Sequence, residues 1–569
     1  MVESNVMEAQ PPQSSPTPIP EIGSLDLAVE AERAGRYVVA WQEALKAITR
    51  RPFHPEAYIQ MASAAVAAGD PKAALAAAQR ALALTPKWPT AQEVVTALER
   101  TLNAHRKQGK KDNPIGWPEL PDPNRKPRLS VCMIVKNEER FLDQCLASVK
   151  DIADELIVID TGSTDRTVEI AREHGAQVGH FEWCNDFAAA RNASIAPATG
   201  DWILFLDADE ELSPIGKADL PRLLSQTQVS LYRLPLINTH QGEKSQSYVP
   251  RLFRNPPGLM FFGCVHEGVL GFIEKICSPW QLSIDFCNLK ILHYGYEPAV
   301  MLEKNKIQRN HDLLRKAILE NPNEFYFHMQ LGLELGRMGK KEESFQEYAE
   351  ALRLAEDTAI NNITPEVRET LLTQYSAYLI VERRFTEVIK VLTGALAKNG
   401  PLTASHLMVR ARAYIHLKQP IKALADAELA HSYRMNGTLF PSAINPQSLA
   451  LEAMMAEVFL INQRYPEALE YFSIALNADQ PELRTILAYS ECLDRSGKTG
   501  EALEYLHNII LNRSNIPAIW IHGASLLLRH EGLKTVAAEW IAEAKEYHPE
   551  NMQVEALANQ VKQEFKKHN

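Results

Sequence analysis

The segment WILFLDADEE, residues 202–211, decides the fold class of this chain. Its first five residues are apolar at every position, which is typical of a strand buried on both faces of a parallel sheet. Asp207 and Asp209 follow the run directly. Hard oxygen ligands at a strand end suit Mg²⁺ or Mn²⁺, and such an ion can neutralise a diphosphate leaving group. The segment therefore predicts a buried strand and a metal site with Asp207 and Asp209 as ligands.

Similar apolar runs precede this segment, at residues 129–135 (LSVCMIV) and 156–159 (LIVI), with a short strand expected near 176–181. Amphipathic stretches lie between the runs, and this alternation predicts a doubly wound α/β domain. Such sheets bind ligands beyond the carboxyl ends of their strands. The loop KNEE follows the first run and Asp160 ends the second. Polar residues are therefore expected to gather at one edge of the sheet.

Two common phosphate-binding motifs are missing from the sequence. The loop KNEE lacks the pattern GxGxxG, which argues against a dinucleotide cofactor, and the chain has no GxxxxGK[ST] motif of a P-loop phosphotransferase. The acidic strand end is therefore the main indication of chemistry.

Both sides of the α/β segment carry a repeat of 34 residues. Gly35 recurs as Gly69, and the sequence EALEY at 467–471 recurs at 501–505. This period is that of tetratricopeptide helix pairs, which stack into solenoids with a concave binding face. We expect the repeats to bind a peptide or protein, with self-association as a homodimer as the alternative.

These patterns divide the chain into segments. A Pro- and Ser-rich tail, a basic Pro-rich linker and connecting helices separate the repeats from the α/β domain. The expected boundaries are 1–24 for a disordered tail, 25–104 for N-terminal repeats, 105–127 for the linker, 128–300 for the α/β domain, 301–329 for connecting helices and 330–569 for a C-terminal solenoid.

Composition excludes several classes of protein. A chain of 569 residues suggests about three to four domains, and its net charge of −11 argues against nucleic acid as a partner. No apolar run approaches the roughly 18 residues of a membrane span, and the N-terminus does not resemble a signal peptide. The seven Cys form no CxxC pair, which favours a cytoplasmic protein without a disulfide framework or structural zinc site.

Three motifs together resemble the family 2 glycosyltransferases: SVCMIVKNEERFLDQCLASV, DELIVIDTGSTDRTVEIA and AAARNASIAPATGDWILFLDADEEL. The resemblance implies an A-type glycosyltransferase fold, a UDP-sugar as donor, Mn²⁺ or Mg²⁺ as cofactor and an inverting mechanism. Joined to tetratricopeptide repeats, the domain is similar to the subgroup of sublancin-type peptide S-glycosyltransferases. That similarity implies transfer to a peptide side chain.

The resemblance also implies roles for single residues. Asp160 matches the carboxylate that recognises the nucleobase, although Thr161 stands where the family often has a second Asp. Asn137 and Glu139 match the first-loop residues of the nucleotide pocket. Arg191 and Asn192 match the helix that faces the nucleotide and the sugar. Asp207 and Asp209 match the metal-binding Asp-x-Asp motif.

The second half of the domain leaves alternatives open. Glu267 in the sequence CVHEG is one expected general base and Glu210 is the other. Arg254 is expected at the phosphates or the acceptor, and His293 as a further metal ligand.

Two other functions stay open at this point. One is transfer to a polysaccharide or a lipid-linked glycan. The other is a non-catalytic scaffold with a degenerate nucleotide-binding domain, against which the intact Asp207 and Asp209 argue.

Overall fold

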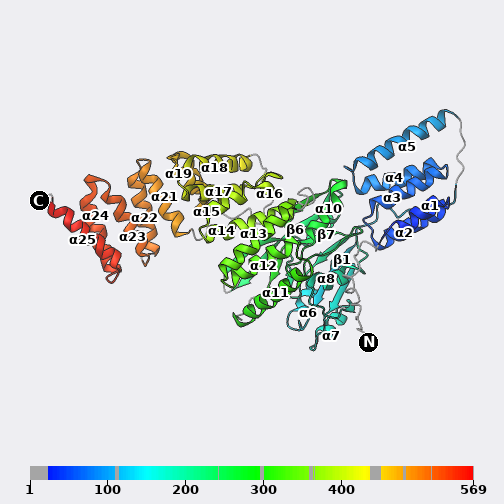
Figure 1. The fold of residues 1–569 in the computed structure, drawn as a ribbon, viewed down its shortest axis with the longest axis horizontal. Coiled ribbons are helices and arrows are strands. Elements are labelled where there is room, and N and C mark those ends of the chain that lie inside the picture. The colour runs from blue at the N-terminus through cyan, green and yellow to red at the C-terminus, as the bar shows by residue number, and fades with distance from the viewer. Residues whose placement is uncertain are drawn as a thin grey trace, which may run out of the picture. The chain divides into compact units, whose positions relative to one another are not determined.

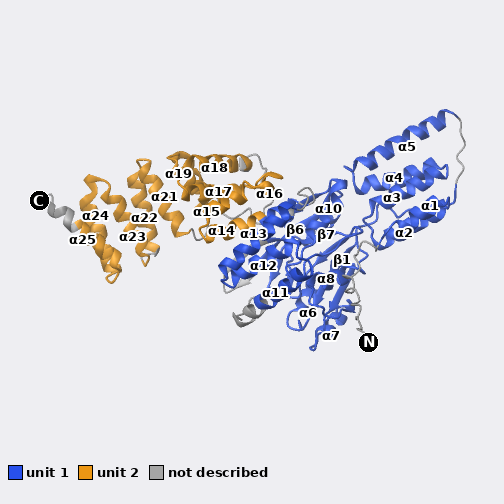
Figure 2. Cartoon of the chain, viewed as in Figure 1, with its two compact units in different colours: residues 1–371 blue, residues 372–569 orange. Residues whose placement is uncertain are grey.

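The computed structural model describes most of the chain, namely residues 23–108, 115–240, 243–294, 300–357, 363, 365–435, 450–477, 482–513 and 515–567. The chain divides into two compact units, residues 1–371 and 372–569, coloured separately in Figure 2. The expected N-terminal tail lies outside the described residues, except for residues 23 and 24. Each unit is described by itself.

The first unit begins with a run of antiparallel helices. Gly35 and Gly69 sit in the turns between paired helices with φ angles of 70° and 83°, which favour glycine. The second helix of each pair ends two residues before Pro52 or Pro86, because proline cannot continue the helical hydrogen bonds. The helices are α1 (Asp26–Arg33), α2 (Tyr37–Arg50), α3 (Pro55–Ala67), α4 (Pro71–Leu84) and α5 (Pro89–Lys107).

A sheet forms the centre of the first unit (Figure 1). Its first half is parallel, in the order β3 (Gln177–His180), β2 (Glu155–Asp160), β1 (Leu129–Val135) and β4 (Trp202–Phe205). Every residue of β4 is buried, and all but one of β1, as the apolar runs predict. The expected α/β domain is therefore confirmed.

The second half of the sheet is largely antiparallel, which the sequence patterns did not predict. β7 pairs with β4 and with β6 in antiparallel fashion, whereas β9 and β8 run parallel to β6. The short β5 pairs with β9 and so returns the chain after the acidic segment to the sheet. These strands are β5 (Glu210–Leu212), β6 (Val229–His240), β7 (Glu243–Arg254), β8 (Ser283–Phe286) and β9 (Ile291–His293).

Short helices cover the sheet. α6 and α7 pack against each other, and α8 contacts β1 and β2. Two large apolar clusters lie among the helices and the sheet. The helices are α6 (Leu142–Val149), α7 (Thr167–Glu173), α8 (Phe187–Ile195), α9 (Leu220–Leu224) and α10 (Leu270–Cys277).

The N-terminal helices and the α/β domain share one apolar core. Trp280, which follows α10, contacts Phe53 and Trp88 of the helical segment with ring centroids 5.6 Å and 6.5 Å apart. The buried Arg51 donates from Nη1 to the carbonyl oxygen of Ile195 and to Oδ1 of Asn255. The N-terminal repeats are thus packed into the α/β domain.

Further helices follow the sheet in both units. In the first unit, α11 (Val300–Glu320) packs on α12 (Phe325–Arg337), and α12 packs on α13 (Lys341–Asp357). No helix of the described residues is long and apolar enough to cross a membrane. The remaining helices are α14 (Pro365–Val381), α15 (Phe385–Val391), α16 (Ala395–Lys398), α17 (Ala404–His416), α18 (Pro420–Met435), α19 (Ala450–Ile461), α20 (Tyr465–Ala475), α21 (Leu483–Arg495), α22 (Thr499–Arg513), α23 (Pro517–Leu528), α24 (Lys534–Tyr547) and α25 (Met552–Lys567).

Candidate active site

A cavity of about 840 Å³ opens at the carboxyl ends of β1 and β4. This is the edge at which the sequence predicts polar residues to gather. Val135 and Lys136 line it from β1 and its loop, and Asp207 and Asp209 line it from the loop after β4. Its far wall comes from β7, from residues 265–269 and from α11.

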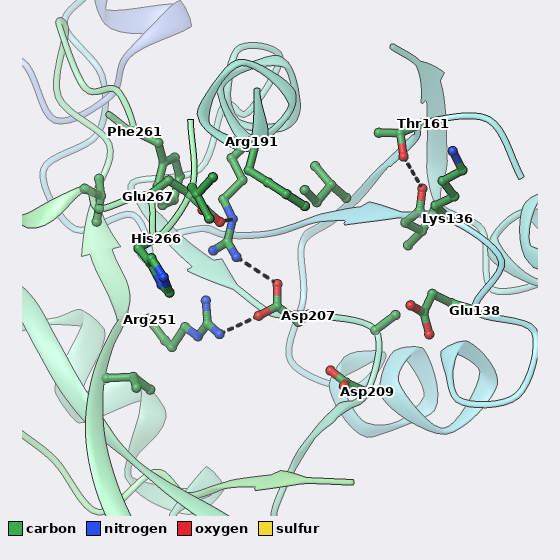
Figure 3. Close-up of a pocket in the computed structure, with 18 of the residues that line it drawn as sticks. Lys136, Glu138, Thr161, Arg191, Asp207, Asp209, Arg251, Phe261, His266 and Glu267 are labelled. Atoms are coloured by element: carbon green, nitrogen blue, oxygen red, sulfur yellow. Dashed lines mark hydrogen bonds and ion pairs between the residues drawn. The ribbon is translucent and has the colours of Figure 1, made fainter. Parts of the chain in front are cut away.

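Asp207 lies between two arginines, as Figure 3 shows. Its Oδ1 is 3.1 Å from a guanidinium nitrogen of Arg191, and its Oδ2 is 2.7 Å from one of Arg251. Burial alone would raise the pKa of the Asp207 carboxyl, but the two guanidinium groups outweigh burial and lower it. Asp207 is therefore ionised and holds two cations at the cavity wall.

Glu210 holds Arg251 and the backbone of Asp207 in place from outside the cavity lining. Its Oε1 lies 2.6 Å from the same guanidinium nitrogen of Arg251, and its Oε2 accepts a hydrogen bond from the backbone N–H of Asp207. The side chain is buried, and it does not line the cavity. Burial raises the pKa of the Glu210 carboxyl. Of the two expected bases, Glu210 is thus placed where it orients Arg251.

Asp209 and His293 meet at the mouth of the acidic loop. His293 Nε2 lies 3.2 Å from Asp209 Oδ2, and the N–H of Tyr294 donates to the carbonyl oxygen of Asp209. The hydrogen bond with the Asp209 carboxylate raises the pKa of His293, although burial opposes this shift. The structure therefore brings together the expected metal ligands Asp207, Asp209 and His293 on one wall.

The ligand set fits a cation only in part. Among the described residues, no three His, Cys, Asp or Glu side chains are close enough to hold a metal ion by themselves. Both oxygens of Asp207 face arginines, which leaves Asp209 and His293 as the side chains of this set that could hold a cation. Mg²⁺ is commonly bound by one or two carboxylates together with substrate phosphates, and Asp209 with His293 suits that mode of binding.

Hydrogen bonds join the loops at which the nucleobase pocket is expected. Asp160 ends β2 and accepts hydrogen bonds from the backbone N–H groups of Gly162 and Ser163. Burial opposes ionisation of Asp160, but these bonds outweigh it and lower its pKa. Asn137 Oδ1 accepts from the N–H of Thr164 at 2.7 Å. Asp160 and Asn137 therefore fix the loops at the rim and do not line the cavity.

Sequence neighbours of Asn137 and Asp160 line this end of the cavity in place of these two residues. Glu139 accepts a hydrogen bond from the backbone N–H of Arg166 and is likewise absent from the lining. Lys136, Glu138 and Thr161 line the cavity instead.

The remaining expected residues separate into two groups. Glu267 lines the cavity, and its Oε1 lies 2.6 Å from Nε of Arg191. Asn192 hydrogen-bonds the backbone N–H and carbonyl oxygen of Phe261, so it anchors the segment before Glu267. Arg254 does not reach the cavity.

Arg254 takes part in the shared core instead. Its guanidinium stacks on the rings of Phe53 and Trp202 at 4.5 Å and 4.1 Å, and its Nε donates to the carbonyl oxygen of Val229. Arg254 therefore links the N-terminal helices to the sheet, whereas Arg251 is the arginine of β7 that faces the cavity.

Helices beyond the sheet complete the cavity. Arg309 and Asn310 of α11 line it directly. Tyr326 of α12 donates a hydrogen bond of 2.6 Å to the carbonyl oxygen of His266. Gly263, with a φ angle of 102°, lets the loop pass beside the Tyr326 ring, which a Cβ would approach to 3.0 Å. Helix α12 thus sets the shape of the loop that carries Glu267.

Residues 130–263 match the family model described as Glycosyl transferase family 2. The chain contains a family 2 glycosyltransferase domain. The resemblance drawn from the three sequence motifs is therefore confirmed. The matched range covers the acidic strand end, Arg191 and Arg251, and it stops before His266, Glu267 and His293.

Two curated relatives of this chain are named as a repeat-containing protein and as a glycosyltransferase. A TPR repeat-containing protein of Synechococcus elongatus is 40% identical over 208 residues, which is 36% of this chain and 51% of that protein. The SPbeta prophage-derived glycosyltransferase SunS of Bacillus subtilis is 34% identical over 226 residues, 38% of this chain and 51% of SunS. The chain spans about half the length of these curated relatives.

Two solved structures each match part of the chain. Glucosyl-3-phosphoglycerate synthase of Mycobacterium tuberculosis is 22% identical, with a TM-score of 0.26, and the match covers 33% of this chain and 79% of that one. A tetratricopeptide repeat protein of Parabacteroides merdae is 16% identical, with a TM-score of 0.30, and the match covers 46% of this chain and 94% of that one.

Proposed function

We propose that this chain transfers a sugar, with inversion, from a UDP-sugar to a peptide or protein side chain, and that the transfer depends on Mn²⁺ or Mg²⁺. One observation carries the proposal. The cavity of a family 2 domain combines an Asp209–His293 pair with the two arginines held by Asp207. Such a wall suits a leaving group with two negative charges.

The reaction places different demands on the residues. An acceptor attacks the anomeric carbon in line while the nucleoside diphosphate leaves, so negative charge develops on the diphosphate. Arg191 and Arg251 are fixed by Asp207 before substrate arrives, and preorganised cations stabilise such charge without reorganisation. Mn²⁺ or Mg²⁺ held by Asp209 and His293 would act as a Lewis acid on the same phosphates.

The acceptor side is argued from the helices. Arg309 and Asn310 lie in the cavity wall, and both precede a run of helix pairs. A solenoid that begins at the active site suits an extended peptide acceptor. The relative named as a TPR repeat-containing protein and the glycosyltransferase SunS support the pairing of such a domain with repeats. A polysaccharide or a lipid-linked glycan is the alternative acceptor.

The test compares two carboxylate variants of the full chain. Asp209→Asn removes the charge at the cation site, whereas Asp219→Asn removes an exposed charge outside the cavity. We expect Asp209→Asn to lower sugar transfer from a panel of UDP-hexoses with Mn²⁺ by about 10²- to 10³-fold, in the range seen when a stabilising group is lost. Asp219→Asn should retain the wild-type rate. Equal rates for the two variants, with EDTA harmless, would contradict the metal-dependent proposal.

The acceptor is tested separately with radiolabelled UDP-hexose and a cell lysate. Label in polypeptide after electrophoresis and organic extraction is the expected result. Label confined to the organic phase would contradict a peptide acceptor and favour a lipid-linked glycan.

A further inference from the structure

His266 has features that packing alone does not require. Its φ angle is 54°, in the left-handed region that non-glycine residues seldom adopt. The ring lines the cavity and lies near Glu267 and Arg251 (Figure 3). Its side chain is 29% exposed, so one edge of the ring is open to the cavity.

A buried carboxylate from α12 fixes the other edge of the ring. His266 Nε2 lies 2.5 Å from Oε1 of Glu334, whose side chain is 0% exposed. Asn310 and Arg337 also donate to this oxygen, both at 3.2 Å. Burial would raise the pKa of Glu334, but its hydrogen bonds with His266 and Asn310 outweigh burial and lower it. An ionised carboxylate therefore orients the ring and holds a proton on Nε2.

This geometry leaves Nδ1 of His266 as the basic nitrogen. A neutral imidazole with its proton on Nε2 has its lone pair on Nδ1. Among the described residues, no hydrogen bond to Nδ1 is found, and Nδ1 is not buried. The carboxylate on the far side would stabilise the imidazolium that forms when Nδ1 takes a proton, as in nucleophile-activating triads.

The carboxylates expected to act as base are engaged elsewhere. Glu267 is paired with Arg191, and Glu210 with Arg251 outside the cavity lining. Taking up a proton would cost each of these carboxylates its ion pair with arginine. His266 lines the cavity with Nε2 held by Glu334 and, among the described residues, with no hydrogen-bond partner at Nδ1.

We propose that His266 is the catalytic base that removes the acceptor's proton and that Glu334 is its positioning residue. The inference rests on the proposed sugar transfer. The acceptor proton moves to Nδ1 of His266, and the acceptor lone pair forms the bond to the anomeric carbon. The bond from that carbon to the diphosphate oxygen breaks, and its electron pair leaves with the diphosphate. The imidazolium then returns its proton to water.

This assignment places part of the chemistry in the helical segment. Glu334 lies on α12, and the family match ends at residue 263. The charged groups that surround the ring are Glu267 of its own loop, Arg191 of α8, Arg251 of β7, Arg309 of α11, and Glu334 and Arg337 of α12.

The first test uses glutamine variants in the full chain. His266→Gln retains a donor for Glu334 but has no basic nitrogen. We expect it to lower sugar transfer and the hydrolysis of UDP-glucose and UDP-N-acetylglucosamine by about 10²- to 10⁴-fold, the usual contribution of a general base. The dissociation constant for UDP with Mn²⁺ should stay within about twofold, because a base removes only the proton-transfer contribution.

Two further variants complete this test. Glu334→Gln should lose less activity than His266→Gln, because the base itself is retained. His311→Gln is the matched control, since His311 lies on α11 beside the exposed Asp312 and does not line the cavity. Retention of most activity by His266→Gln would overturn the proposal.

The second test is chemical rescue. Glycine accepts a positive φ, so His266→Gly leaves the loop unstrained and opens a space next to Glu334. Added imidazole should restore activity to His266→Gly but not to His266→Gln, whose side chain fills the space. Absence of rescue in a folded His266→Gly variant that binds UDP would contradict a base role and indicate a structural one.

A third measurement does not depend on activity. In histidine-labelled protein, ¹⁵N spectra compared with those of His266→Gln should show a protonated Nε2 and an unprotonated Nδ1. A proton on Nδ1 at neutral pH would overturn the assignment even if no acceptor were found. Failure of the proposed function appears differently, as an inactive wild-type chain with the expected tautomer.

Discussion

The shared core of the first unit makes a quantitative prediction about Trp280. Its side chain is 1% exposed, and its ring contacts Phe53 and Trp88 of the N-terminal helices edge to face. Replacing a buried Trp by Ala costs about 3–5 kcal/mol. Each aromatic contact contributes about 0.5–1.5 kcal/mol beyond its area, so two lost contacts place Trp280→Ala near the upper end.

The expected melting shift follows from the size of the unit. For domains of 150–250 residues, 1 kcal/mol changes Tm by about 2–4 °C, and larger units respond less. The first unit ends at residue 371, so we expect Tm to fall by about 6–10 °C. Trp520→Ala is the matched control, because Trp520 is equally buried and contacts Trp540 in the second unit. Only the second unit's calorimetric transition should shift in that variant.

Hydrogen exchange read by mass spectrometry decides whether the core is truly shared. In Trp280→Ala, protection should fall together in α3, α4 and the strands β1 and β4. If protection were lost only within residues 23–107 while the strands stayed as in the wild type, the helices would be an independent module. The shared-core reasoning would then be refuted.

Two other perturbations address the cavity and the N-terminal helices. Arg251→Gln leaves Asp207 and Glu210 without the guanidinium that they share. Urea unfolding should therefore show a free energy of unfolding lower by about 3–5 kcal/mol, and calorimetric titration should show weaker UDP binding. Unchanged values for both would contradict the role of this arginine. Burial lowers the pKa of His54 to about 4 from its ordinary 6.5, so the folded state excludes a proton that the unfolded chain binds. The contribution of His54 to the free energy of unfolding is complete above pH 6.5, and it should fall by about 3 kcal/mol as the pH drops to 4. His54→Gln should flatten this dependence, and an unchanged pH profile in that variant would assign the acid sensitivity to other groups.

The parallel half of the sheet was predictable from sequence because its strands are buried on both faces. A strand such as LSVCMIV must then be apolar throughout, and the polar residues after it must collect at one edge. Asp207, Asp209, Arg191 and Glu267 were found by this reasoning together with the family resemblance, and all four line the cavity.

The antiparallel half was harder to predict because its strands mix apolar and polar residues. Arg251 and Arg254 are three residues apart on one strand, so they point to opposite faces of the sheet. Only Arg251 lines the cavity, while Arg254 stacks on Trp202. The period of the strand could have shown that both cannot serve one site, but it could not show which face holds the cavity.

Contacts between distant segments left no sequence signal. His266 and Glu334 are 68 residues apart, and Glu334 lies in a helix whose repeat pattern predicts only packing. A buried charged residue in such a helix is recognisable once its partner is known, because burying an unpaired carboxylate is costly.

The cavity wall to which α11 contributes, and the loop at His266 that α12 supports, limit how this chain can be recombined. A chimera that joins the sheet to a foreign array of repeats at residue 263 or 294 would discard Arg309, Asn310 and Glu334 together with the original array. Exchange of the array therefore requires a junction beyond α12, after Arg337, so that the helix contacting the loop at His266 stays with the sheet. A transferable form of this glycosyltransferase domain therefore already includes the first helices of the array that follows the sheet.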